Sequence, residues 1–206
     1  MNTFLWGLVL SSALIWASNE SPYFPIKIKP GDDGISKFEA EWYGKSLERM
    51  KEPRLPGFIK DVNAEVYRVM ILPTWGNPIV VRVRKRAEIY SLSARRLDGQ
   101  GGYDPGKLVE TTDVDLNADD SKALDALIQK LDFFNLATDD GGMGKDGDES
   151  IIEGVSSGRY HVVQRWCATS YDTEKRRLGA FVALVRFLLD KSNLSTRPSN
   201  KGHRLI

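Results

Sequence analysis

The chain has 206 residues, with 29 Lys and Arg, 28 Asp and Glu, and a single cysteine. Hydrophobic residues make up 41% and charged residues 28%, which excludes collagen-like, low-complexity, polytopic membrane and disulfide-stapled proteins. The net charge of +1 argues against a partner bound through overall charge alone, such as bulk nucleic acid. We expect one globular domain with a hydrophobic core of its own.

An apolar segment without charged side chains opens the chain, from Met1 to Ala17. The helix that Phe4 to Ala17 could form would be about 21 Å long, which is shorter than the ~30 Å hydrocarbon core of a bilayer. Small Ala17 is followed by the polar Ser18 and Asn19, as at a cleavage site. We therefore predict a signal peptide over 1–17 and a periplasmic or secreted protein with no stable membrane span after cleavage. An uncleaved interfacial anchor and a buried core helix are the alternatives.

Cys167 is the only cysteine, so the chain can form no internal disulfide, and no lipid-acceptor cysteine follows the apolar segment. This favours a soluble exported protein over a lipoprotein. Cys167 follows an apolar, strand-like run, and we interpret it as a small buried hydrophobe rather than a nucleophile.

The rest of the chain divides into three parts. Residues 18–35 are rich in Pro and Gly and suggest an extended lead-in, residues 36–191 form the domain, and residues 192–206 form a polar tail. Ser36 and Glu39 match a capping box at the start of a helix, and Asn117 can cap a second one. Helices are expected over about 37–51, from 118 onward, and over about 173–191. Strands are expected from 65 onward and over about 79–86, 87–97, 108–116, 150–155 and 159–166.

This order of elements predicts an α+β fold. One antiparallel sheet of about six strands would follow an initial helix as β-β-β-β-α-β-β-α, with the helices packed on one face. In the strand that starts at Ile79, Arg82, Arg84 and Arg86 alternate with Val81 and Val83. The alternation predicts that the other face of the sheet is exposed to solvent.

The last two strands can pair as a hairpin in two registers. A three-residue loop, Ser156 to Gly158, would place Glu153 opposite His161, whereas a two-residue loop of Ser157 and Gly158 would place Glu153 opposite Val162. We favour the three-residue loop because it pairs opposite charges with each other and apolar residues with each other.

Two runs of the chain stand out, Leu97 to Leu108 (LDGQGGYDPGKL) and Glu153 to Trp166 (EGVSSGRYHVVQRW). They resemble motifs of a family of uncharacterised exported bacterial proteins, and the resemblance covers about residues 36–190. Ser150, Cys167 and Ala168 depart from the pattern. The resemblance implies a bacterial, envelope-facing protein and carries no specific activity.

Three groups of residues are candidates for function. Glu153 and His161 could act as an acid and base pair. Neither a nucleophile elbow nor a second His at metal-ligand spacing accompanies them. The alternative is that they form a structural cross-strand pair. The acidic loop from Asp139 to Glu149 lacks the spacing of a calcium-binding loop, so we expect no metal. The glycines of 99–106 lack the spacing of a nucleotide-binding motif, so we expect no cofactor. The candidate binding residues are Arg68, Arg82, Arg84, Arg86, Tyr103, Tyr160 and Arg165.

These observations favour a non-enzymatic, exported protein-binding module, such as an inhibitor or immunity-like protein, that contacts a protein of the cell envelope. Its contact surface would be the basic strand face and the Gly-rich loops. The basic residues have an alternative role, which is to protect an edge strand from aggregation. An envelope hydrolase that uses Glu153 and His161, or a structural envelope protein, are the other hypotheses.

Overall fold

The computed structural model describes residues 22–29 and 34–195, and the predicted signal peptide lies outside these residues. The helices are α1 (Lys37–Arg49), α2 (Ala118–Leu131) and α3 (Gly179–Lys191), with 3₁₀ turns η1 (Leu55–Lys60) and η2 (Phe133–Asn135). The strands are β1 (Glu65–Pro73), β2 (Ile79–Arg86), β3 (Ile89–Leu97), β4 (Leu108–Asp115), β5 (Asp148–Ser156) and β6 (Arg159–Trp166). Their order along the chain is the predicted one.

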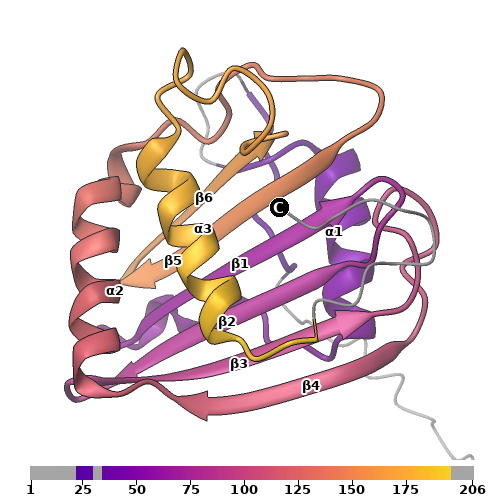
Figure 1. Ribbon diagram of the computed structural model, residues 1–206. Helices are drawn as coiled ribbons and strands as arrows, with labels where there is room; N and C mark the ends of the chain where they lie inside the picture. The colour runs from indigo at the N-terminus through magenta and orange to yellow at the C-terminus, as the bar shows by residue number, and fades with distance from the viewer. Residues whose placement is uncertain (1–21, 30–33, 196–206) are drawn as a thin grey trace, which may run out of the picture.

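All six strands form one antiparallel sheet in the order β4-β3-β2-β1-β5-β6 (Figure 1). The predicted α+β class with a single sheet is confirmed. β1 and β5 pair in the interior of the sheet although 75 positions separate Pro73 from Asp148, and β2, β3, β4 and α2 lie in the connection between them. The interior strands are therefore β3, β2, β1 and β5, and β4 and β6 are the edges.

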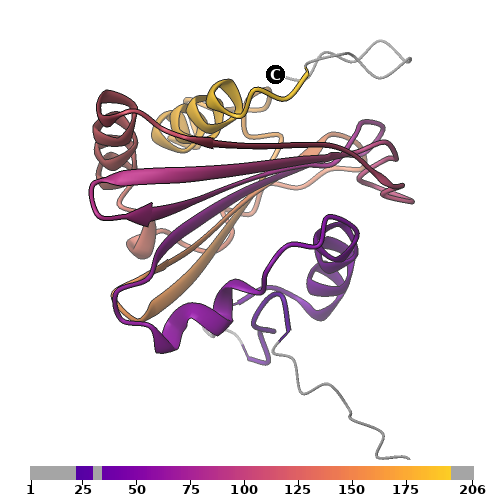
Figure 2. The same ribbon diagram turned by 90° about the horizontal axis from the view of Figure 1, so that it is seen from below.

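Helices cover both faces of the sheet, so the expectation that they share one face is wrong. α2 and α3 lie side by side over one face, and Figure 2 shows α1 on the other. The reason lies in β1, in which every residue from Val66 to Leu72 is buried. Tyr67, Val69 and Ile71 join the core under α2 and α3, whereas Met70 and Leu72 join a second core under α1. A strand with two apolar faces requires cover on each side.

The predicted helix starts are confirmed for α1 and α2. The Ser36 hydroxyl accepts from Glu39 N at 3.2 Å and the Glu39 carboxylate from Ser36 N at 2.8 Å, which completes the capping box. The Asn117 side chain accepts from Asp120 N at 2.8 Å. α3 starts later than predicted, at Gly179, because Asp172 and Arg177 adopt left-handed backbone angles (φ 46° and 57°) that interrupt a helix.

The β5–β6 hairpin adopts the register that we did not favour. Ser156 pairs with Arg159, so the loop is Ser157 and Gly158, and Glu153 lies opposite Val162. Both loop residues have positive φ, 52° and 71°, as a tight two-residue turn between twisted strands requires. The cross-strand charge pairs that supported the other register were a weaker signal than this turn geometry.

The domain extends beyond the predicted boundaries. Phe24 and Ile35, from the expected lead-in, are buried in the core under α1, and the Phe24 ring meets Tyr43 edge to face at 5.9 Å. At the other end, Ser195 N donates to the Glu110 carboxylate on β4 at 2.7 Å.

Within the described residues, no helix is long and apolar enough to cross a membrane.

Candidate functional site

Arg68, a predicted binding residue, is completely buried under α1. Its guanidinium binds the Glu153 carboxylate through Nε at 2.8 Å and through NH2, donates to Pro53 O at 2.7 Å and lies 3.6 Å from Glu52. The Tyr160 hydroxyl donates to the other Glu153 oxygen at 2.8 Å. Burial opposes the positive charge, but Glu153 and Glu52 outweigh it and raise the pKa of Arg68. Arg68, Glu153 and Tyr160 thus satisfy one another inside the protein.

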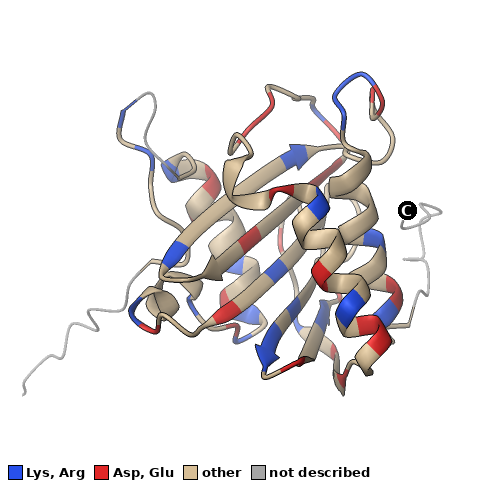
Figure 3. Ribbon diagram, turned by 90° about the vertical axis from the view of Figure 1, so that its left-hand side faces the viewer, with Lys and Arg blue, Asp and Glu red and all other residues tan. Residues whose placement is uncertain are grey.

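Glu52 links this network to β2 and β3. Arg82 Nε donates to its carboxylate at 2.9 Å, and Arg95 binds the other oxygen. Arg84 lies over the Phe58 ring at 5.4 Å, whereas Arg86 at the end of β2 is exposed. The prediction of a solvent-exposed basic face is therefore wrong, because Glu52 and Phe58 of the segment after α1 contact these arginines. On the side shown in Figure 3, basic and acidic residues are interspersed and form no basic stripe.

Glu153 and His161 do not form a pair. In the observed register His161 lies opposite Gly154, one position away from Glu153, so the two side chains point to opposite faces of the sheet. The imidazole Nε2 lies 2.8 Å from Leu136 O, and the ring packs edge to face on Phe133 at 5.2 Å between centroids. The geometry removes the acid and base pair on which the hydrolase hypothesis depended.

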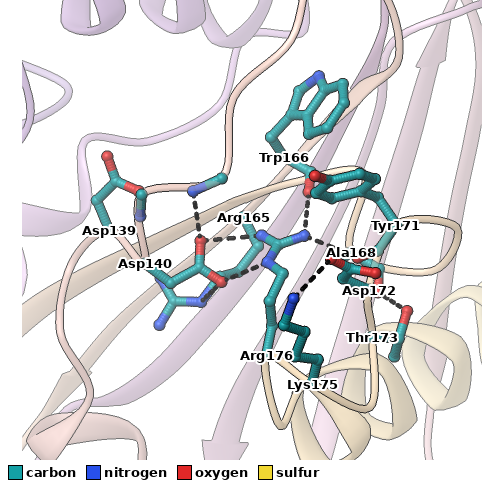
Figure 4. A network of polar contacts seen from close by, with 12 residues as sticks. Asp139, Asp140, Arg165, Trp166, Ala168, Tyr171, Asp172, Thr173, Lys175 and Arg176 are labelled. Carbon is teal, nitrogen blue, oxygen red and sulfur yellow. Dashed lines mark hydrogen bonds and ion pairs between the residues drawn. The ribbon is translucent and has the colours of Figure 1, made fainter.

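Arg165, the last predicted binding residue on β6, anchors the loop that precedes β5. It donates to Ala137 O at 2.9 Å and to Thr138 O at 3.1 Å, and lies 3.7 Å from the Asp140 carboxylate. Arg176 binds the same carboxylate with two hydrogen bonds of 2.8 and 2.9 Å and also donates to Trp166 O (Figure 4). These arginines hold Asp140 in place, and they lower its pKa against the effect of its burial. The sequence analysis did not single out Arg176.

The exposed aromatic residues form a different candidate site, at the end of the sheet where the β1–β2 and β3–β4 loops lie beside each other (Figure 1). Trp75 and Tyr103 are 44% and 58% exposed, and their ring centroids are 4.9 Å apart. On α1, the exposed Phe38 lies 6.0 Å from Trp42, whose indole donates to Gly101 O at 2.6 Å. We call Phe38, Trp42, Trp75 and Tyr103 the loop-end aromatic surface.

Backbone contacts fix the two loops to each other. Gly101 N donates to Gly76 O at 3.0 Å, and Gly102 N donates to Thr74 O at 3.3 Å. A Cβ atom on Gly101 would lie only 2.7 Å from Pro73 O, so a larger residue would push the loops apart. The glycines of the predicted Gly-rich loop therefore allow the close approach that places Tyr103 beside Trp75.

The sequence analysis identified Tyr103 but missed Trp75 and Trp42. Trp75 lies between Pro73 and Pro78 in the loop that joins β1 to β2, and an aromatic residue in such a loop is the signal that could have found it. Trp42 lies in α1, and an aromatic residue at helical spacing is typical of a buried helix face rather than of a binding surface.

No group of three or more His, Cys, Asp or Glu in the described part of the chain could hold a metal ion. The chain matches no family model, no curated protein and no solved structure.

Proposed function

We propose that this chain is an exported, non-enzymatic protein-binding module of the bacterial envelope and that it contacts its protein partner through the loop-end aromatic surface. The exposed Trp75–Tyr103 pair is the observation that carries this proposal. Export is proposed from the N-terminal apolar segment, and the bacterial envelope from the motif resemblance.

The chemistry of the surface supports a protein partner. Trp and Tyr are enriched among the residues that dominate binding energy at protein interfaces, because each buries a large area at a small cost in side-chain entropy. Trp75 and Tyr103 are mounted on loops that hydrogen bonds already hold in place. Little further ordering is therefore needed when a partner docks, which favours binding.

Crosslinking the tagged, full-length protein in its native envelope tests the proposal. We expect the double variant Trp75→Ala/Tyr103→Ala to lose the crosslinked partner, since truncating an aromatic residue that dominates an interface costs about 2 kcal/mol or more. Tyr171→Ala is the matched control, because Tyr171 is a similarly exposed aromatic, at 48%, in a different loop. A partner recovered equally well with the double variant and the wild type would contradict the proposal.

A further inference from the structure

A pocket of about 590 Å³ lies beside β6, away from the loop-end aromatic surface. Three parts of the chain line it: Lys27 with residues 34–39 at the start of α1, the segment that follows η2, and β6 itself. The lining residues are Lys27, Gly34, Ile35, Ser36, Glu39, Leu136, Ala137, Thr138, Asp139, His161 and Gln164. The volume lies within the range of small-molecule sites.

Two polar side chains in the wall are more than nine-tenths buried. Gln164 is 6% exposed and His161 7%. Gln164 Nε2 donates to Glu39 Oε1 at 2.7 Å, and the Tyr43 hydroxyl donates to Gln164 Oε1 at 3.4 Å. The other Glu39 oxygen accepts from Ser36 N. The Glu39 carboxylate is thus held in one orientation by donors on two elements.

Asp139 supplies a second carboxylate to the lining. Its Oδ1 accepts from Gly141 N at 2.8 Å, which fixes the side chain to its own loop. Among residues 22–29 and 34–195, no ion pair joins Glu39 or Asp139 to a lysine or arginine. Lys27 also lines the pocket, but it is an exposed residue. Asp139 is likewise exposed, and it favours the charged form of the nearby Arg165 without pairing with it. Within the described structure neither carboxylate therefore forms a direct ion pair with a lysine or an arginine.

Burial and this negative charge together raise the pKa of two neighbouring groups. Burial, with Glu39, Asp148 and Asp139 adding to it, raises the pKa of Glu149 to about 8, while Arg176 lowers it only in part. Burial also raises the pKa of Tyr43, and Glu149, Glu39 and Asp139 raise it further. A cation in the pocket would relieve the repulsion among these acidic groups.

The walls also favour an organic ligand over a bare ion. Ile35, Leu136 and Ala137 provide apolar surface, and no metal-ligating group of three His, Cys, Asp or Glu occurs among the described residues. We propose that this pocket binds a small organic cation with a protonated primary amine, which the Glu39 and Asp139 carboxylates accept while the apolar wall contacts its carbon chain. The amine can belong to a free small molecule or to a lysine side chain of a peptide.

Titration calorimetry with 1,5-diaminopentane tests the charge requirement, and the uncharged 1,5-pentanediol of the same length is the control. We expect saturable binding of the diamine and none of the diol. Comparing free lysine amide with the peptide Gly-Lys-Gly then distinguishes the two sources, since the better ligand identifies which one the pocket accommodates. Absence of saturable diamine binding, or equal binding of the diol, would overturn the proposal.

Asp139→Asn removes one charge and keeps the oxygen that accepts from Gly141 N. We expect it to weaken diamine binding about tenfold or more, because a charge-assisted hydrogen bond contributes about 1.5–3 kcal/mol. Asp146→Asn is the matched control, since Asp146 is an exposed acidic residue of the same loop and does not line the pocket. Equal affinities of the two variants would refute the role of Asp139.

The pH dependence of diamine binding is a second measurement, and a purely structural role of the carboxylates would not affect it. A primary amine remains protonated from about pH 7 to about pH 9. Glu149 ionises over this range, which adds negative charge near Glu39 and Asp139. We expect diamine affinity to rise with pH in the wild type and to stay level in Glu149→Gln. An affinity that does not change with pH in the wild type would count against the proposal.

Discussion

At the scale of single residues, the charged side chains in the interior are the least expected feature. A fully buried arginine is rare. Arg68 is tolerated because the Glu153 carboxylate and the Pro53 carbonyl accept its hydrogen bonds and Glu52 forms an ion pair with it. The three partners come from β5 and from the segment that follows α1. The network therefore specifies how the α1 side docks on the sheet.

Arg68→Met should destabilise the protein by about 3–5 kcal/mol, because it leaves Glu153 buried without its cationic partner. Chemical denaturation measures this loss. Arg86→Met is the control on the neighbouring strand, and we expect it to change stability by less than about 0.5 kcal/mol because Arg86 is exposed. The double variant Arg68→Met/Glu153→Gln should recover part of the loss. Similar stabilities of Arg68→Met and Arg86→Met would show that the network contributes nothing.

At the scale of elements, the β5–β6 turn determines which side chains share a face. With two loop residues in place of three, every residue of β6 pairs with a position one further along β5 than in the favoured prediction. Because side chains alternate along a strand, that single step puts His161 on the face opposite to Glu153, whereas the β1–β5 register places Glu153 with Arg68. The turn therefore decides between a catalytic and a structural interpretation of the hairpin.

Gly158→Ala should destabilise the protein by about 1 kcal/mol, since Gly158 has φ +71°, where a Cβ atom is unfavourable. The cost comes from the backbone, because the nearest atom to an added Cβ is Ile59 O at 3.7 Å. Gly57→Ala in η1 is the matched control, with open space around the added Cβ, and should be nearly neutral. Thermal unfolding of both variants compares them, and equal midpoints would argue against the turn geometry.

At the scale of the whole molecule, hydrophobic cores lie on both faces of the sheet rather than on one. Leu124 of α2 belongs to the core under α2 and α3, and Leu47 of α1 belongs to the core under α1. β1 contributes to both, so the two cores share a strand. We infer that the two layers unfold together.

Leu47→Ala and Leu124→Ala test this inference, because both leucines are completely buried. Each substitution should cost about 2–5 kcal/mol and shift one shared unfolding transition. Denaturation followed by tryptophan fluorescence and by circular dichroism should give coincident curves for both variants. A separate early transition in Leu47→Ala alone would show that the α1 layer unfolds independently.

The local signals in the sequence predicted most of the fold. Alternation, helical spacing and the caps at Ser36 and Asn117 identified every helix and strand in the correct order, because these patterns depend on near neighbours in the chain. The last helix began later than predicted because left-handed residues interrupt the chain before it. The candidate sites were predicted less well, because Arg68, Arg82 and Arg165 are charged residues that, from the sequence alone, were expected at the surface.

The sequence by itself determined the composition class, the order of the elements and the presence of a Gly-rich loop carrying Tyr103. Only the tertiary structure decided that α1 covers the second face of the sheet, that the strand arginines bind Glu52 and Glu153, and that Trp75 lies beside Tyr103. The physical reason is the distance along the chain over which each kind of interaction acts. Periodicity and capping act over a few residues, whereas ion pairing and loop contacts join positions that are 16 to 85 residues apart. The sequence does not state which of these separated segments meet.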